Sequence, residues 1–257
     1  MTKDGKGQVV SAEPARKGQV IKMSAEGGAE IGEDGGQVPK KPEKGQVITE
    51  RGQVIKIGWV LGWGVPEGWF ERLARTAFPF AVHTFAAAAP GGLDGLARAG
   101  PFDWVAGYSL GTLVLLGEAE RVARLGRVAL LAPIFGFPSE ANKGGRISRT
   151  QVRQLSRQVR RDPLAALADF YRRAGLDVSG EDASAVSAAD LLWGLERLEG
   201  DGVSPPLPKG WLAWCGGDDP LLDAGRLQAI EPRVTIVVGG THHPLALLRE
   251  FSAATHS

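Results

Sequence analysis

The sequence has one cysteine, no long apolar run and almost no net charge. Because Cys215 is the only cysteine, an intramolecular disulfide is excluded, and this usage is typical of a reducing compartment. No apolar run approaches the roughly 18 residues that a membrane-spanning helix needs, and the charged start of the chain lacks the apolar stretch of a secretion signal. A net charge of +1 argues against general binding to nucleic acid. We therefore expect a cytoplasmic protein that binds neither membranes nor nucleic acid.

Residues 1–53 differ in composition from the rest of the chain. They lack aromatic side chains, are rich in glycine, and carry nearly equal numbers of basic and acidic residues. The tripeptide Gly-Gln-Val recurs in this segment at irregular spacing, which excludes a repeat fold of fixed period. Such a segment cannot bury enough apolar surface to offset the entropy lost on ordering. We expect a disordered, low-complexity tail, with a docking tail as the functional alternative.

Short apolar runs alternate with helical patterns from Val54 onward. With 43% hydrophobic residues, the chain can bury one substantial core. A helical pattern with apolar residues on one face occupies residues 67–77. Strand patterns occur at residues 54–61, 81–88, 102–106, 128–133, 211–215 and 234–238. This alternation predicts an α/β fold with a mostly parallel sheet covered by helices, formed by residues 54–138 and 210–257.

A long segment without strand patterns separates the two parts of this expected core. We expect one helix at residues 148–161 and a second that begins at Asp162-Pro163, an N-cap followed by proline at the first helical position, and ends before Gly175. A third is expected near residues 190–198. The segment is far too long for an ordinary crossover loop, so we assign residues 139–209 to an inserted helical cap.

The pentapeptide at residues 107–111 carries the strongest functional signal. Its residues, Gly-Tyr-Ser-Leu-Gly, match the G-x-S-x-G turn that raises a serine nucleophile between a strand and a helix. With 36 glycines in the chain, this spacing can also arise by chance. The context favours function, because a strand pattern at 102–106 leads into the turn and an apolar helical pattern at 112–119 leaves it. Ser109 is therefore the candidate nucleophile.

A serine nucleophile needs a base to accept its proton and an acid to orient that base. Of the four histidines, His83 precedes the serine on a predicted strand, and His256 lies at the end of the sequence. His242 and His243 directly follow the last predicted strand. A loop at that strand end is where a base can reach Ser109, so the base is expected in this pair.

The acid is expected after the preceding strand, where Asp218 and Asp219 stand. The chain then presents serine, aspartate and histidine in the order of α/β-hydrolases. The side chains of neighbouring residues point in different directions. Only one residue of the aspartate pair and one residue of the histidine pair can therefore belong to the site. Turn formation and helix capping are the alternative roles for these pairs. The residues alone leave the choice within each pair open.

The oxyanion formed during acyl transfer needs preorganised N–H donors. The residue after the nucleophile, Leu110, provides one candidate backbone N–H. The second is expected in the loop after the first strand, Gly62-Trp63-Gly64, where glycines let the backbone turn an amide inward. We therefore expect the Trp63 and Leu110 N–H groups to form an oxyanion hole.

No pattern in the sequence points to a metal or a cofactor. His, Cys, Asp and Glu do not cluster with metal-ligand spacing. No glycine-rich phosphate-binding motif follows a strand. Cys215 lies within a predicted buried strand without a motif around it, and we expect it to be inert core packing.

The first expected cap helix is strongly basic. Residues 146–173 contain eight arginines and two aspartates, a local balance of 8 − 2 = +6. Arg149, Arg153 and Arg157 recur at every fourth position, and Arg160 continues their face. A solvated helix face is one interpretation of this pattern. An acidic partner is the other, because arginine binds carboxylates and phosphates with two hydrogen bonds.

Taken together, four motifs resemble the α/β-hydrolase superfamily, and within it the pimeloyl-[acyl-carrier protein] methyl ester esterases of biotin synthesis. The motifs are Leu61-Gly62-Trp63-Gly64, Gly107-Tyr108-Ser109-Leu110-Gly111, Gly216-Gly217-Asp218-Asp219 and Thr241-His242-His243-Pro244. These esterases also have a helical cap with a row of arginines and a helix containing Leu-Glu, here Leu195-Glu196. The resemblance covers about residues 55–250. The sequence departs from the family at Leu61, where His or Asn is usual, and at Leu222-Asp223, which replaces Val-Pro.

The resemblance implies an α/β-hydrolase fold and a catalytic triad of Ser109, Asp219 and His242. It also implies that the cap arginines dock an acidic acyl carrier protein. The expected function is a serine carboxylesterase that hydrolyses an acyl methyl ester through an acyl-enzyme. A general short-chain carboxylesterase or other acyl hydrolase is the alternative within the enzymes. A non-catalytic acyl-carrier-binding protein is the alternative outside them.

Overall fold

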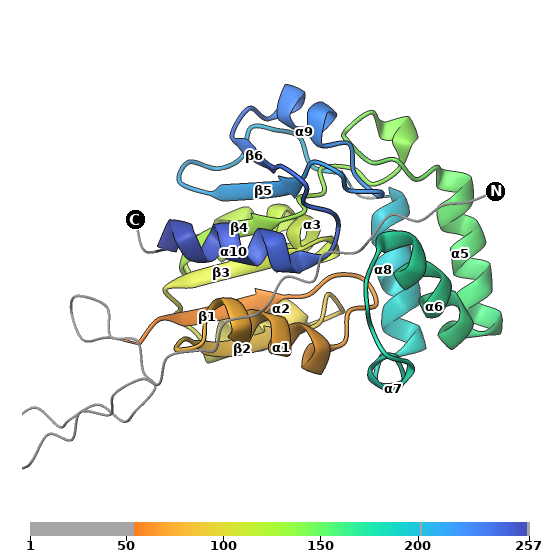
Figure 1. The fold of residues 1–257 in the computed structure, drawn as a ribbon, viewed down its shortest axis with the longest axis horizontal. Coiled ribbons are helices and arrows are strands. Elements are labelled where there is room, and N and C mark those ends of the chain that lie inside the picture. The colour runs from red at the N-terminus through yellow and green to blue at the C-terminus, as the bar shows by residue number, and fades with distance from the viewer. Residues whose placement is uncertain (1–53, 201, 256–257) are drawn as a thin grey trace, which may run out of the picture. The chain divides into compact units, whose positions relative to one another are not determined.

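The computed structural model describes residues 54–200 and 202–255, and it contains a six-stranded sheet (Figure 1). The expected tail of residues 1–53 and His256 lie outside the described residues. All neighbouring strands are parallel and stand in the order β2-β1-β3-β4-β5-β6. The strands are β1 Lys56–Val60, β2 Val82–Ala86, β3 Trp104–Tyr108, β4 Arg127–Leu131, β5 Leu212–Gly216 and β6 Val234–Val237. The predicted parallel α/β fold is thereby confirmed.

Helices cover both faces of this sheet. The helices of the core are α1 Glu67–Ala77, α2 Gly92–Ala99, α3 Leu110–Gly117, α4 Ala119–Val122, α9 Ala224–Ile230 and α10 Pro244–Thr255. The chain runs outward from β1 to β2 and then back past β1 to β3. Because parallel crossovers are right-handed, this reversal places α1 on one face and α2, α3 and α9 on the other. Helix α10 contacts α1 and covers the same face (Figure 1).

The segment between β4 and β5 contains further helices: the short 3₁₀ helix η1 Ser139–Ala141, α5 Arg149–Arg161, α6 Pro163–Ala174, α7 Gly180–Ala183 and α8 Ala188–Gly200. We call α5–α8 the cap. These helices lie beyond the carboxyl ends of the strands (Figure 1). They fall within the span 139–209 that the sequence assigns to an insertion.

The sequence explains where the cap helices begin and end. Ser148 caps α5 in a reciprocal capping box with Gln151. Asp162 ends α5 and caps α6, where its Oδ1 accepts a hydrogen bond from the Ala165 N–H at 3.0 Å. Gly175, at φ 69°, ends α6. The predicted boundaries of these two helices are confirmed.

The strand that leads to the candidate nucleophile differs from its prediction. The pattern placed it at residues 102–106, whereas β3 spans Trp104–Tyr108. Pairing with β4 explains the shift, since Gly107 and Tyr108 lie opposite Leu130 and Leu131. The sheet register therefore extends into the motif itself, and the helix begins directly after Ser109.

An aromatic cluster fills the core on the α1 and α10 face. Trp59 of β1 is fully buried and makes edge-to-face contacts with Phe70, Phe78 and Phe251, at ring-centroid distances of 5.3, 6.1 and 5.9 Å. Such pairs stabilise beyond the area that they bury. They fix α1 and α10, which follow the oxyanion loop and the candidate base, against the sheet. Within the part of the chain that the structure describes, no helix is long and apolar enough to cross a membrane.

Candidate active site

The candidate site lies where the strand order reverses. In the sheet, β1 and β3 are neighbours. The chain leaves β1 toward β2, on one side of this pair, and leaves β3 toward β4, on the opposite side. The loops that leave β1 and β3 therefore diverge and open a crevice at the carboxyl edge of the sheet, the usual binding place of open α/β sheets. The Gly62-Trp63-Gly64 loop and Ser109 meet at this edge, where a Cβ at Gly62 would lie 3.2 Å from Ser109 Cβ.

Ser109 sits in a sparsely populated backbone conformation. Its φ of 52° and ψ of −118° place it at the sharp turn between β3 and α3. Such strain persists only where the surroundings enforce it, and it is typical of functional sites. The close approach of α3 to β1 is one such constraint, because a Cβ at Gly111 would lie 2.0 Å from the Val60 carbonyl oxygen.

Thr112 ties this turn to the loop after β4. Its hydroxyl donates to the Ser109 carbonyl oxygen at 2.7 Å and accepts from the Ile134 N–H at 2.8 Å. The Ser109 N–H in turn donates to the Leu131 carbonyl oxygen at 2.9 Å. The backbone of the candidate nucleophile is thus held on both sides by buried hydrogen bonds, which the motif spacing alone does not reveal.

The structure brings Ser109, His242 and Asp219 into one hydrogen-bonded chain. His242 Nε2 lies 3.1 Å from Ser109 Oγ, and His242 Nδ1 lies 2.7 Å from Asp219 Oδ2. All three are buried, with exposed fractions of 6% for the serine and 1% for the other two. Because an ionised carboxylate cannot donate, Nδ1 carries the proton and Nε2 is free to accept one from the serine.

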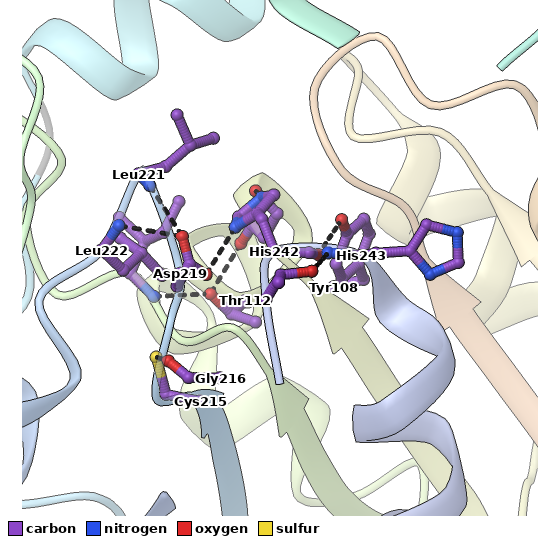
Figure 2. Close-up of polar contacts among 12 residues, drawn as sticks. Tyr108, Thr112, Cys215, Gly216, Asp219, Leu221, Leu222, His242 and His243 are labelled. Carbon is purple, nitrogen blue, oxygen red and sulfur yellow. Dashed lines mark hydrogen bonds and ion pairs between the residues drawn. The ribbon is translucent and has the colours of Figure 1, made fainter. Parts of the chain in front are cut away.

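The second oxygen of Asp219 is also hydrogen-bonded (Figure 2). Its Oδ1 accepts from the N–H groups of Leu221 at 2.8 Å and Leu222 at 3.0 Å. These bonds hold the carboxylate with its Oδ2 directed at the imidazole. Leu222, one of the two departures from the family pattern, contributes through its backbone, so the changed side chain leaves this contact intact.

The other members of the two vicinal pairs point elsewhere. Asp218 is exposed to solvent, and its backbone N–H donates to the Gly240 carbonyl oxygen at 2.8 Å. His243 is directed away from the Asp219–His242 pair (Figure 2), and its Nε2 lies 3.1 Å from Asp177 Oδ1. Asp177 is further contacted by Trp69 Nε1. Burial would raise the pKa of Asp177, but hydrogen bonds from His243, the backbone and Trp69, together with the electrostatic effect of His243, outweigh it and lower that pKa.

Tyr108 is a site residue that the sequence analysis missed. Its hydroxyl donates to the backbone carbonyl oxygen of His242 at 2.7 Å, and its ring lies 5.5 Å from the imidazole. Complete burial raises the pKa of Tyr108 well above its ordinary value, with a further contribution from Asp219. The hydroxyl therefore stays protonated. Tyr108 occupies a variable position of the motif, which carries no signal for this role.

The candidate oxyanion loop is a tight turn. The Val65 N–H donates to the Gly62 carbonyl oxygen at 3.3 Å, and Gly64 has a φ of 65°, as the third residue of a type II turn requires. Within residues 54–200 and 202–255, no protein acceptor binds the Trp63 N–H or the Leu110 N–H. Both predicted oxyanion donors thus flank the crevice with free N–H groups.

An apolar cavity of about 80 Å³ lies between the cap and the loops of the core. Trp63 and Leu221 form its wall on the side of the candidate site, and Val152, Leu155 and Phe170 line it from the cap. Leu155 is half-buried and borders this cavity. The cavity offers apolar surface beside Trp63 of the candidate oxyanion loop.

The basic face of α5 is exposed but not uniform. Arg153 Nε forms an ion pair with Glu199 Oε1 of α8 at 2.6 Å. The Arg149 backbone N–H binds the Glu140 carboxylate. Arg157 and Arg160 are exposed and make no ion pair with any described residue. Part of the row is thus engaged within the chain, and its distal part remains open.

Two candidate groups of the sequence lie outside the site. His83 accepts from Trp59 Nε1 at 3.0 Å through Nδ1 and contacts the Phe78 carbonyl oxygen through Nε2, and burial lowers its pKa. It is therefore a neutral core histidine. Cys215 is fully buried, and burial raises the pKa of its thiol. No group of three or more His, Cys, Asp or Glu within the described ranges could hold a metal ion.

Comparison with solved structures finds the same fold in several hydrolases. An esterase from Exiguobacterium antarcticum is 12% identical with a TM-score of 0.56, covering 82% of this chain and 91% of its own. An enol-lactonase from Burkholderia xenovorans LB400 is 14% identical with a TM-score of 0.57, covering 80% and 92%. A hydrolase from Oleispira antarctica is 10% identical with a TM-score of 0.56, covering 79% and 88%.

No protein-family model and no curated protein sequence matches the chain. The fold is therefore identified by structure. The likeness to these hydrolases extends over most of the chain. The structure also has a parallel sheet with the strand order given above, a strained serine between β3 and α3, and helices inserted after β4. The chain has the α/β-hydrolase fold.

Proposed function

We propose that the protein is a serine hydrolase that cleaves carboxylic esters through an acyl-enzyme. The observation that carries this proposal is the buried chain of hydrogen bonds from Ser109 Oγ through His242 to Asp219. Each contact has the length that proton transfer requires, and the donors and acceptors are ordered for it. The hydrolases and esterases among the structures of similar fold agree with this reaction class.

In the proposed first half-reaction, Ser109 Oγ attacks the ester carbonyl carbon while His242 Nε2 accepts the hydroxyl proton. The negative charge that develops on the carbonyl oxygen meets the N–H groups of Trp63 and Leu110. Asp219 stabilises the imidazolium and keeps it oriented. The tetrahedral intermediate then collapses, the ester C–O bond breaks, and His242 gives its proton to the departing alcohol.

In the second half-reaction, water replaces the alcohol. His242 Nε2 accepts a proton from the water as its oxygen attacks the acyl-enzyme, and the same N–H donors hold the new oxyanion. The C–O bond to Ser109 breaks, the serine recovers the proton from His242, and the carboxylic acid leaves. No group beyond the chain and water is required.

For the substrate we propose an acyl methyl ester, in keeping with the resemblance to pimeloyl-[acyl-carrier protein] methyl ester esterases. The apolar cavity beside Trp63 supports an acyl chain there. A general short-chain carboxylesterase is the alternative, which the same cavity also suits.

We further propose that an acidic acyl carrier protein docks on the cap through the open arginines. Arg157 and Arg160 are the strongest candidates, because they are exposed and not neutralised by neighbouring carboxylates. Arg149 and Arg153 lie on the same helix, but the pairing of Arg153 with Glu199 competes with a partner.

Substitution of the nucleophile tests the reaction class. Ser109→Ala is expected to abolish hydrolysis of methyl esters and labelling by a fluorophosphonate, measured as a mass increase of the intact protein. Ser139→Ala, at an exposed serine near the cap, is the matched control and is expected to keep both. Retained hydrolysis in Ser109→Ala, or labelling at another serine, would show that the nucleophile is wrongly assigned.

A second experiment tests the carrier. Methyl esters are offered free and attached to acyl carrier protein, and kcat/KM is compared. Arg157→Glu and Arg160→Glu are expected to lower kcat/KM for the carrier-bound ester only, and salt is expected to do the same. Arg98→Glu, at an exposed position of α2 outside the cap, is the control. Equal rates for free and carrier-bound esters would instead favour the general esterase.

A further inference from the structure

The cap reaches the candidate oxyanion turn with two hydrogen bonds. The indole Nε1 of Trp63 donates to the Leu191 carbonyl oxygen of α8 at 2.8 Å. The hydroxyl of Tyr171, in α6, donates to the Gly64 carbonyl oxygen. Both contacts are buried, and Trp63 and Tyr171 are only 3% and 4% exposed. The two central residues of the turn are therefore each fastened to a different cap helix.

The turn supplies little rigidity of its own. Its own hydrogen bond, from Val65 N–H to the Gly62 carbonyl oxygen, is long at 3.3 Å. Gly64 has a positive φ, and a Cβ there would lie 2.5 Å from a methyl carbon of Leu167 in α6. Glycine lets the backbone approach the cap closely, but it also makes the turn intrinsically deformable. External anchors must therefore supply the rigidity.

Helix α8 also packs on both proposed oxyanion residues. It comes so close at Gly194 that a Cβ there would lie 2.6 Å from Trp63 Cδ1 and 2.8 Å from Leu110 Cδ2. On the other face of the indole, the Phe170 ring of α6 makes an edge contact at a centroid distance of 4.7 Å. The cap thus fixes the residues whose N–H groups would meet the oxyanion, without supplying a reacting group itself.

From these contacts we propose that Tyr171 is a positioning residue, and that the cap, seated through Tyr171 and Leu191, completes the oxyanion hole. This inference rests on the proposed function, because it concerns the same N–H donors. An oxyanion donor contributes only when it is preorganised at the place where charge develops. A turn released from its anchors places the Trp63 N–H over a range of positions, and transition-state stabilisation falls.

The Tyr171 hydroxyl is suited to this role at every working pH. Burial raises the pKa of Tyr171 above its ordinary value, with a further contribution from Asp182. The hydroxyl therefore remains a donor where a carboxyl or imidazole would titrate. Its acceptor, the Gly64 carbonyl oxygen, would otherwise be buried without a partner, so the bond is favoured over an open arrangement.

Tyr171→Phe tests this proposal, since it removes the hydroxyl and keeps the ring. We expect kcat for a small methyl ester to fall about tenfold with KM changed less than twofold, because the lost interaction acts in the transition state. Hydrogen exchange of the amides of residues 62–65 is expected to accelerate in the same variant. Intact mass labelling by fluorophosphonate should slow in proportion to kcat.

Arg72→Ala is the matched control. Arg72 in α1 forms an ion pair with Asp182 in α7 at 2.8 Å, so it too joins the core to the cap, but it does not touch the oxyanion turn. We expect unchanged exchange at residues 62–65 and a kcat within twofold of the parent. An equal loss of kcat in both variants would assign the effect to general loosening of the cap and overturn the proposal.

The outcomes separate this inference from the proposed function. If the parent protein hydrolyses esters but Tyr171→Phe leaves kcat or the exchange rate unchanged, the positioning role alone is overturned. A parent protein that neither hydrolyses esters nor reacts with fluorophosphonate overturns the proposed function, and the positioning role with it. A selective loss of kcat together with faster exchange supports both.

Discussion

The hydroxyl of Tyr108, the residue before the candidate nucleophile, donates to the backbone carbonyl oxygen of His242, the candidate base, at 2.7 Å. These residues are 134 positions apart in the chain. The strand that presents the serine thus also holds the loop that presents the histidine. This bond links the backbone of His242 directly to the side chain next to Ser109 in the sequence.

Removal of this hydroxyl is expected to lower kcat more strongly than it lowers the stability of the fold. Tyr108→Phe leaves a buried carbonyl oxygen without a donor, so the free energy of unfolding should fall by about 1–2 kcal/mol. We expect kcat to fall about tenfold, because His242 is less well placed. Urea unfolding and steady-state hydrolysis measure the two effects. A stability loss with unchanged kcat would limit Tyr108 to a structural role.

Asp219→Asn tests which aspartate orients the imidazole. An amide at this position can donate to Nδ1 and stabilise the wrong tautomer, so kcat should fall about 10³-fold or more with the fold preserved. Asp218→Asn is the matched control at the neighbouring exposed position and is expected to keep the parent kcat. The reverse ranking of the two variants would reassign the acid. Circular dichroism and ester hydrolysis are the measurements.

Thr112→Val tests the anchor beneath the nucleophile. The variant keeps the shape but removes the hydroxyl that bridges the Ser109 carbonyl oxygen and the Ile134 N–H. Because Thr112 is fully buried, we expect a loss of about 1–3 kcal/mol in the free energy of unfolding and a lower kcat. Thr112→Ser restores the hydroxyl and should recover most of kcat. Failure of serine to do so would assign the effect to packing.

A buried carboxylate away from the site should make stability depend on pH. Glu231 is 2% exposed and binds the Arg233 guanidinium and the Leu207 N–H. Hydrogen bonds from Arg233 lower its pKa, although burial opposes them. Since the folded-state pKa lies below the unfolded value of about 4.3, the stabilisation is complete above that pH and is lost as pH falls through the folded-state pKa.

Glu231→Gln is therefore expected to cost about 2–3 kcal/mol of unfolding free energy at pH 7 and less at pH 3.5, provided both proteins remain folded there. Urea unfolding at several pH values measures the difference. Glu250→Gln, at an exposed position of α10, is the control and should change stability by less than about 0.5 kcal/mol at every pH. A difference that does not vary with pH would mean that the charge of Glu231 is unimportant.

The sequence predicted the parts of the site that depend on chain order. Ser109 stands in a motif, and the aspartate and histidine pairs follow strands, so their place at the carboxyl edge of a parallel sheet follows from topology. Spacing could not choose between His242 and His243, because that choice depends on side-chain direction. The structure makes it by burying His242 and turning His243 toward Asp177.

Contacts made by residues at variable positions could not be predicted. Tyr108 and Tyr171 look like ordinary core tyrosines in a one-dimensional pattern, and each acts on a backbone carbonyl more than 100 residues away. The pairing of Arg153 with Glu199 also joins two helices whose register was unknown. Helix α10 was not expected either, although Pro244 at its first position is a signal for a helix start.

The two hydrogen bonds between the cap and the oxyanion turn have a consequence for protein engineering. A chimaera that keeps this core but takes its cap from another hydrolase inherits a buried indole N–H at Trp63 and a buried carbonyl oxygen at Gly64. Unless the donor cap offers an acceptor and a hydroxyl at matching places, both groups lose their partners, and each costs about 1–3 kcal/mol. Substrate range is therefore easier to change by substitutions within α5–α8 than by exchange of the whole insertion.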